Sequence, residues 1–436
     1  MRARPSARVL ARILVAGLAA LALGGCDALD RLLAVEPRDR VAAAPLESSP
    51  ANASLLANGA IADFDCAFGA YVVMGGLIGE ELDEAQASLD RKPYDQRTHT
   101  SGDRLYAVGT CDLLGVYTPL QTARVSAERV LRLLEGWTDA EVPQRATLIA
   151  TMHAYAGYST LLLGEGFCTT VLSSLDANRK LVYGREISRD SAFRAAEAHF
   201  SAAIAAAEQE AGASAIFNLA LVGRARTRLD LGDYAGARGD VARVPPDFRY
   251  DMTASTTTNR RQNRVFVQTR EPVLKELTSV GVLYRSLGDP RVPVTDARRK
   301  STVGVPIFLQ NKYPSATSPI RIAGGAEAQL IVAEADIVAG TVASLQNALA
   351  LINAFRARGN QTRLTTTDPG ELRAALIDQR RRELFLEGQH LGDMIRFDVT
   401  LTPAAGAPFP GGGVYGVQKC LFLPDVERQN NPALHG

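Results

Sequence analysis

Hydrophobic positions recur every three to four residues over much of the chain, which is the spacing that places them on one face of an α-helix. In residues 117–134, for example, Leu120, Ala123, Ala127 and Leu131 fall on one side. The same spacing predicts further helices over residues 60–77, 144–163, 191–208, 216–244, 320–338, 345–358 and 369–387. The chain is therefore expected to be mainly α-helical.

Small residues form a second pattern on these helices. Residues 144–163 carry one large apolar face and another face made of small residues, such as Ala150 and Gly157, and small side chains let neighbouring helices approach closely. Within residues 216–244, a Gly-Asp-Tyr turn followed by Pro245 resembles tetratricopeptide helical hairpins. One unit is clear and the others are degenerate, so stacked hairpins are predicted rather than a long uniform solenoid.

Two stretches lack the helical pattern. Residues 87–103 are polar and predict a loop, and the acidic residues just before it, at 80–84, are expected to form a solvated turn. The alternative for this turn is a carboxylate pair for acid–base or cation chemistry. Residues 244–323 are expected to be an irregular insertion with short strands at 264–267 and 305–309.

The N-terminus has the layout of a secretory signal. Four Arg residues accompany an apolar run at residues 13–23, which is shorter than the roughly 20 residues of a membrane span. Leu23-Gly24-Gly25-Cys26 then resembles a bacterial lipobox, in which the Cys is acylated. We expect a signal peptide at 1–25, a lipid-anchored tether at 26–53 and one α-rich domain at 54–436. The alternative is an ordinary signal peptide with an incidental Cys26. No later segment is expected to span a membrane.

Composition and charge narrow the classes of function. The chain has 436 residues, of which 46% are hydrophobic and 22% charged, so it can bury a large core. The formal charge is +1, and the first 25 residues carry four Arg and no acidic residue, so the remainder carries −3. Because nucleic-acid-binding domains are usually clearly basic, no nucleic acid is expected as a partner.

Five cysteines bear on the redox environment. With Cys26 assigned to the lipid, Cys66, Cys111, Cys168 and Cys420 remain in a chain exported to a compartment where disulfides persist. Four cysteines allow three pairings. We favour Cys66–Cys111 and Cys168–Cys420, because the first pair would join the first helix to the segment before the next. Reduced, buried cysteines are the alternative. The histidines show no zinc-binding spacing and no nucleophile motif occurs, so no metal, cofactor or catalytic site is expected.

The most distinctive stretch lies at residues 368–397. Asp368 and Pro369 mark the start of a helix, and Gly388 marks its end. The interleaved charges read Arg-Arg-Glu-Leu-x-x-Glu-Gly-x-x-x-x-Asp-x-x-Arg and end at Arg396. Together with a closing Pro-x-x-Glu-x-x-x-Asn-Pro at residues 424–432, they resemble the C-terminal signatures of the SusD/RagB family of outer-membrane nutrient-binding lipoproteins.

The resemblance implies a fold, a location and partners. The fold would be mainly α, with tetratricopeptide-like helical hairpins, an irregular loop-rich insertion at 244–323 and a few short strands. The protein would face outward on the outer membrane, bind an oligosaccharide, another oligomer or a peptide without breaking bonds, and deliver it to a SusC-type TonB-dependent transporter. Five charged residues match the family motifs and are interpreted as architectural: Arg382, Glu383, Glu387, Asp393 and Arg396.

Candidate ligand contacts come only from placement in predicted loops. Tyr94, Arg97, Tyr106 and Tyr313 lie there, where a ring or guanidinium group can stack on a ligand, and simple surface decoration is the alternative. The single Trp, Trp137, lies at a helix end, where it fits packing as readily as sugar stacking. A second functional hypothesis is a tetratricopeptide-type envelope scaffold lipoprotein that binds no small molecule. A hydrolase is the third, although no motif places a pair of carboxylates.

Overall fold

The computed structural model describes residues 46–435, except residues 87, 177–179, 209, 211 and 271–276. The chain divides into two compact units, Met1–Ser49 and Pro50–Gly436. The predicted signal peptide, the predicted lipidation site Cys26 and most of the predicted tether lie outside the described residues. All the elements that follow belong to the second unit.

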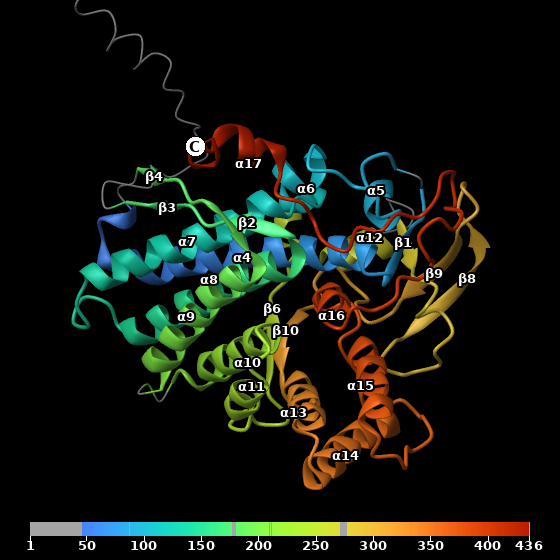
Figure 1. Cartoon of the computed structure of the whole chain (residues 1–436). Helices are drawn as coiled ribbons and strands as arrows, with labels where there is room; N and C mark the ends of the chain where they lie inside the picture. The colour runs from blue at the N-terminus through green and yellow to red at the C-terminus, as the bar shows by residue number, and fades with distance from the viewer. Residues whose placement is uncertain are drawn as a thin grey trace, which may run out of the picture. The chain divides into compact units, whose positions relative to one another are not determined.

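A long buried helix, α4 (Ala53–Ile78), runs through the middle of this unit (Figure 1). Its aromatic residues Phe64, Phe68 and Tyr71 are buried. It begins earlier than the sequence pattern predicts and continues through two adjacent glycines to its C-cap, Gly79, whose N–H donates to Gly75 O at 2.7 Å. The helix packs against α7 (Tyr117–Gly136), α8 (Arg145–Gly166), α12 (Arg264–Thr269) and α16 (His390–Arg396).

This first helix also corrects an expectation about membrane spans. The sequence predicts no segment after the signal peptide that is long and apolar enough to span a membrane. Pro50–Ile78 is long and apolar enough by length and composition. Its apolar window is 83% buried inside the fold, which is how the core helix of a globular unit behaves. The apolar character of this helix is therefore explained by the protein core.

Helical hairpins make up most of the unit and confirm the predicted mainly α fold. Consecutive helices pack against each other, as Figure 1 shows for the green and orange parts of the chain. Residues 244–323 separate α11 (Tyr234–Val241) from α13 (Gly325–Ala339) in the sequence, yet these two helices pack together. The row of hairpins therefore continues past the insertion. The remaining long helices are α9 (Arg189–Ala207), α10 (Ser214–Asp230), α11 (Tyr234–Val241), α13 (Gly325–Ala339), α14 (Val342–Arg358) and α15 (Pro369–Glu383).

Glycines at the helix contacts explain the small-residue pattern. An added Cβ at Gly157 in α8 would lie 2.8 Å from a ring carbon of Phe200 in α9, and one at Gly223 in α10 would lie 2.4 Å from the same ring. Contacts this short do not occur between real Cβ atoms and their neighbours. The Phe200 ring therefore fills the space that these two glycines leave between three helices.

The described strands form two-stranded antiparallel sheets. Three of these pairs involve the insertion: β1 (Leu82–Glu84) with β7 (Thr278–Val280), β6 (Arg249–Met252) with β10 (Ile320–Gly324), and β8 (Val294–Lys300) with β9 (Pro306–Gln310). The other two pairs are β2 (Thr169–Val171) with β5 (Glu186–Ser188), and β3 (Ser174–Leu175) with β4 (Leu181–Val182).

The two predicted strands of the insertion have opposite outcomes. The prediction at 305–309 is confirmed by β9. The prediction at 264–267 is wrong, because these residues begin α12. The side chain of Asn263 accepts from Phe266 N and caps the helix, and this capping signal outweighs the strand preference of the valines that follow.

Short helices and disulfides fasten the loops to this framework. Disulfides join Cys66 in α4 to Cys111 in η2, and Cys168 after α8 to Cys420 near the C-terminus, with Cα–Cα distances of 5.6 and 5.2 Å. The second disulfide brings the C-terminal segment back to α8. The short helices are α5 (Lys92–Asp95), α6 (Arg104–Val108), η2 (Cys111–Leu113), η3 (Asn259–Arg261) and α17 (Asp425–Asn430).

Candidate functional site

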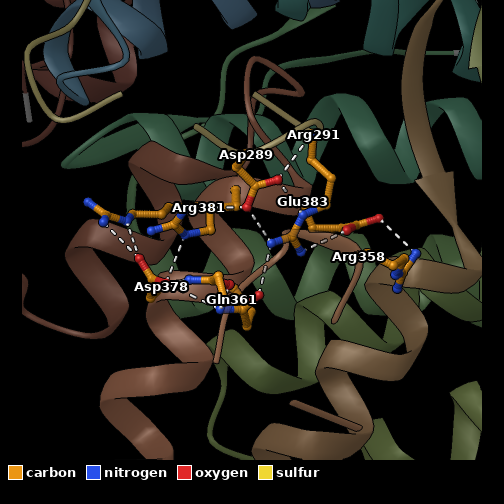
Figure 2. Close-up of polar contacts among 9 residues, drawn as sticks. Asp289, Arg291, Arg358, Gln361, Asp378, Arg381 and Glu383 are labelled. Atoms are coloured by element: carbon orange, nitrogen blue, oxygen red, sulfur yellow. Dashed lines mark hydrogen bonds and ion pairs between the residues drawn. The ribbon is translucent and has the colours of Figure 1, made fainter. Parts of the chain in front are cut away.

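The motif charges of α15 form a network with two other segments of the chain (Figure 2). Glu383 accepts from Arg291 Nη1 at 3.2 Å and from Arg358 Nη1 at 3.3 Å, so it joins α15 to the turn after residue 288 and to α14. Arg382 reaches Asp378 on its own helix at 2.8 Å and Asp289 at 3.2 Å. Burial raises the pKa of Asp289, but hydrogen bonds from Arg291 outweigh it and hold that pKa below its usual value.

A second ion-pair network lies deeper, where α10, α13, α15 and α16 meet. Asp393 accepts from Arg380 Nε at 2.7 Å and from Arg396 Nη2 at 2.8 Å. Arg396 also pairs with Glu334 and lies 3.4 Å from Asp230. Arg380, Glu334 and Asp393 are buried, and the opposite charges of the network pair with one another, which supports the architectural interpretation of the motif charges.

The acidic residues at 80–84 are not a solvated turn, so that expectation is wrong. Glu80 and Glu81 are 6% and 1% exposed. Glu80 Oε1 accepts from Arg97 Nη1 at 2.7 Å and from Thr402 N at 2.5 Å, and Glu81 Oε1 accepts from Leu386 N at 2.7 Å. Burial raises the pKa of Glu80 to about 7 and that of Glu81 to about 8.

The four residues proposed as ligand contacts are buried, so the expectation that they are exposed is wrong. Tyr94, Arg97, Tyr106 and Tyr313 are at most 3% exposed. The Tyr94 ring stacks on His99, with 5.5 Å between ring centroids. The hydroxyl of Tyr106 donates to a carbonyl of the C-terminal segment at 3.1 Å, and that of Tyr313 donates to Leu386 O at 3.0 Å. The returning C-terminal segment covers much of the loop, and the sequence carries no signal of that contact.

An open cavity lies beside the same loop, and we call it the loop cavity. It has a volume of about 660 Å³ and lies between residues 90–114 and residues 259–277. The two predicted irregular stretches therefore meet at one site. Its lining residues are Asp90, Arg91, Leu105, Asp112, Leu113, Leu114, Asn259, Gln262, Arg264, Val267, Gln268 and Leu277.

Arg264 fixes the two sides of the loop cavity relative to each other. Its guanidinium donates to Asp112 O in η2 at 3.0 Å and to Asn259 O at the start of η3. It is 4% exposed, and burial among carbonyl groups lowers the pKa of Arg264. The Cys66–Cys111 disulfide holds η2 on α4 in addition. The cavity is therefore preformed rather than assembled around a ligand.

The cavity combines apolar surface with hydrogen-bonding amides. Leu113 is 65% exposed at its edge, and Asn259 is exposed on the opposite side. Gln268 is 5% exposed, and its Oε1 has no hydrogen-bond partner among the described residues. These residues carry no motif, and none of them was predicted from the sequence as a ligand contact.

Residues 312–421 match the model of the SusD family. The matched segment contains the motif charges of α15 and α16 and the ion pairs between them. The segment that carries the motif charges is therefore similar to the SusD family. SusD family members are non-catalytic binding proteins, and the family includes glycan-binding surface proteins.

Solved SusD-like structures share the fold over most of the chain. A SusD-like carbohydrate-binding protein from Bacteroides vulgatus has a TM-score of 0.66 at 14% identity, covering 89% of this chain and 97% of that one. Surface glycan-binding protein A from Bacteroides uniformis has a TM-score of 0.65 at 14% identity, covering 87% and 98%. A laminarin-binding SusD-like protein has a TM-score of 0.61 at 16% identity, covering 86% and 96%. No curated protein sequence matches the chain.

The SusD family match and the loop cavity occupy different parts of the sequence. All the residues that line the cavity precede residue 312, where the match begins. The SusD motif therefore belongs to the framework, and the ligand-sized opening belongs to segments with no motif. Among the described residues, no group of three or more His, Cys, Asp or Glu side chains is arranged to hold a metal ion.

Proposed function

We propose that this chain is a cell-surface lipoprotein that binds an oligosaccharide in the loop cavity and delivers it to a SusC-type TonB-dependent transporter. The observation that carries the proposal is the loop cavity itself, a preformed opening lined by amide and leucine side chains, on a SusD-like framework. Binding is noncovalent, and no bond of the ligand is broken.

The chemistry of the lining suits a neutral, hydroxyl-rich ligand. The amides of Asn259, Gln262 and Gln268 offer both donors and acceptors for sugar hydroxyls. Leu105 and Leu113 offer apolar surface for the C–H faces of a sugar ring. The lining charges balance, with Asp90 and Asp112 against Arg91 and Arg264, so the site has no strong preference for a charged ligand. Its volume is within the roughly 300–1,000 Å³ of small-molecule sites.

The three SusD-like relatives support the class of ligand. Their descriptions name carbohydrate, glycan and laminarin as what those proteins bind. The described lining of the loop cavity contains no aromatic residue, so recognition here depends on hydrogen bonds and aliphatic contacts rather than on ring stacking. We therefore expect modest affinity, with selectivity set by the pattern of hydroxyl groups.

A binding screen of glycans and peptides tests this proposal. The protein is a chain that begins at residue 27, and the variants are Asn259→Ala and Leu113→Ala in the cavity and Gln346→Ala, on the exposed side of α14, as the matched control. We expect at least one oligosaccharide to bind, the two cavity variants to bind it about ten-fold more weakly or worse, and the control to bind normally. Binding of peptides alone, or oligosaccharide binding unchanged in both cavity variants, would overturn the proposal.

A further inference from the structure

A second open cavity lies away from the loop cavity and shares no lining residue with it. Its volume is about 560 Å³, and it lies between α7, the segments that carry β2, β3 and β4, and α17. Figure 1 shows β3 and β4 alongside α7, with α17 near them. We call it the hairpin cavity.

Side chains of α7 hold the extended segment from β2 to β3 through the carbonyl groups of alternate residues. Gln121 Nε2 donates to Val171 O at 2.7 Å, Arg124 Nη2 donates to Ser173 O, and Arg132 Nη1 donates to Leu175 O. Because carbonyl groups of alternate residues point to the same side of a strand, this edge faces α7 along its length. The hairpin is therefore fixed on the helix and does not depend on a ligand for its position.

The same alternation places one face of the hairpin over the cavity. Leu175 pairs with Leu181 in the antiparallel register, and Ser174 pairs with Val182. Leu175, Leu181 and Tyr183 line the cavity, whereas Val182, between the last two, does not. Leu181 is 49% exposed and Tyr183 is 41% exposed. An aromatic ring and a leucine are thus presented, half exposed, on the cavity face.

Polar groups line the opposite side of the cavity. Thr118, Thr122 and Ser126 come from α7, and Glu427 and Asn430 come from α17. Glu427 Oε1 accepts from Asn431 Nδ2 at 3.0 Å, which orients its carboxylate. Hydroxyl, amide and carboxylate groups opposite an exposed tyrosine ring form an amphipathic site, which matches a sugar ring with its apolar C–H face and its hydroxyl edge.

We infer that the hairpin cavity is a second saccharide-binding site, in which Tyr183 stacks on a sugar ring and the groups of α7 and α17 bind its hydroxyls. The class of ligand is taken from the proposed function, whereas the site is argued independently from the lining of the hairpin cavity. A protein with two separate saccharide sites on one surface binds a long glycan more tightly than either site binds a single unit, if both sites engage the same chain.

Tyr183 and Val182 provide a matched pair of variants for the test. They are adjacent in the sequence, at the end of β4 and just after it, with 41% exposure for Tyr183 and 49% for Val182, but only Tyr183 lines the cavity. An oligosaccharide that binds the chain from residue 27 is titrated calorimetrically into wild type, Tyr183→Ala, Leu181→Ser, Val182→Ser and Asn259→Ala. Circular dichroism checks that each variant is folded.

We expect two binding events in wild type. Tyr183→Ala and Leu181→Ser should weaken one event at least ten-fold, Asn259→Ala should weaken only the other, and Val182→Ser should change neither. Protection of residues 171–183 from hydrogen exchange by the oligosaccharide, lost in Tyr183→Ala, gives a second readout. A single event that responds to Asn259→Ala but not to Tyr183→Ala would overturn this inference and leave the proposed function standing. No binding to any variant would overturn both.

Discussion

At the scale of single residues, burial decides the state of the carboxylates beside α4. Four acidic residues within five positions look like a solvated turn in the sequence, yet Glu81 is 1% exposed and Glu84 is 1% exposed. Glu84 is compensated by Arg91 at 2.7 Å. Glu81 receives one backbone N–H, and burial raises its pKa to about 8, so it is largely protonated at neutral pH.

Replacing Glu81 by Gln is expected to change how stability depends on pH. In the unfolded chain Glu81 ionises near 4.5, whereas in the folded chain it holds its proton up to about pH 8. Its presence therefore lowers the free energy of unfolding progressively as pH rises from 4.5 to 8. Glutamine keeps the shape and an acceptor for Leu386 N without ionising. We expect Glu81→Gln to match wild type near pH 4 and to exceed it at pH 8 by on the order of a few kcal/mol.

Urea unfolding at both pH values measures this difference. The exposed Glu135→Gln on α7 is the control and should change stability little at either pH. If the curves of Glu81→Gln and wild type stay parallel between pH 4 and pH 8, Glu81 does not hold a proton in the folded state.

At the scale of elements, close contacts between helices depend on glycines rather than on helix propensity. Gly223 lies inside α10, where alanine would be the better helix former by about 1 kcal/mol. An alanine Cβ there would lie 2.4 Å from Phe200, whose ring is fully buried between helices and cannot move away freely. In the sequence, these close helix contacts were indicated by small residues that recur on one helix face.

Substitution of Gly223 by Ala is expected to destabilise the protein by about 1–3 kcal/mol, because overpacking outweighs the gain in propensity. The matched control is Gly239→Ala in α11, where an added Cβ meets no atom within 4 Å. That change should stabilise the protein by about 0.5–1 kcal/mol. Thermal unfolding of both variants measures the opposite signs, and a Gly223→Ala variant as stable as wild type would show that the Phe200 ring moves at little cost.

At the scale of the whole molecule, the C-terminal segment and the two disulfides hold the loops in place. The Cys168–Cys420 disulfide brings residues near the C-terminus to the end of α8. Arg97 Nη1 binds buried Glu80, and Lys92 Nζ donates to Gly412 O at 2.8 Å, so the 88–103 loop contacts both α4 and the returning segment. This contact buries the residues first proposed to bind ligand and leaves the loop cavity open beside them.

The lipid anchor is a prediction at this same scale, from residues outside those described. We expect a Cys26→Ser chain to be exported but recovered in the soluble envelope fraction, while wild type stays with the outer membrane, because acyl chains contribute about 0.8 kcal/mol per buried methylene. Fractionation and immunoblotting measure it. Affinity capture of the wild-type chain from solubilised membranes is expected to recover a TonB-dependent barrel. Capture of an envelope assembly complex without a barrel would favour the scaffold hypothesis.

Local patterns made the helices and their caps predictable. Asp368 accepts from Glu371 N at the start of α15 as its sequence predicts, and Gly388 adopts a φ of +78°. The strand prediction at 264–267 failed because Asn263 caps a helix there, although the two valines that follow favour a strand. The irregular segments around the site were located correctly, but the residues chosen within them were the aromatic and basic ones, which the fold buries.

The sequence by itself determined most of the helices of this protein and the motif that resembles the SusD family, since helix periodicity, caps and the charged motif depend on residues within a few positions of one another. Only the tertiary structure decided which of its polar residues meet solvent. Tyr106 and Glu81 are buried against segments about 300 residues away in the sequence, while Leu113 and Asn259 are left beside an open cavity. Burial is a property of contacts between distant segments, and no local pattern records it.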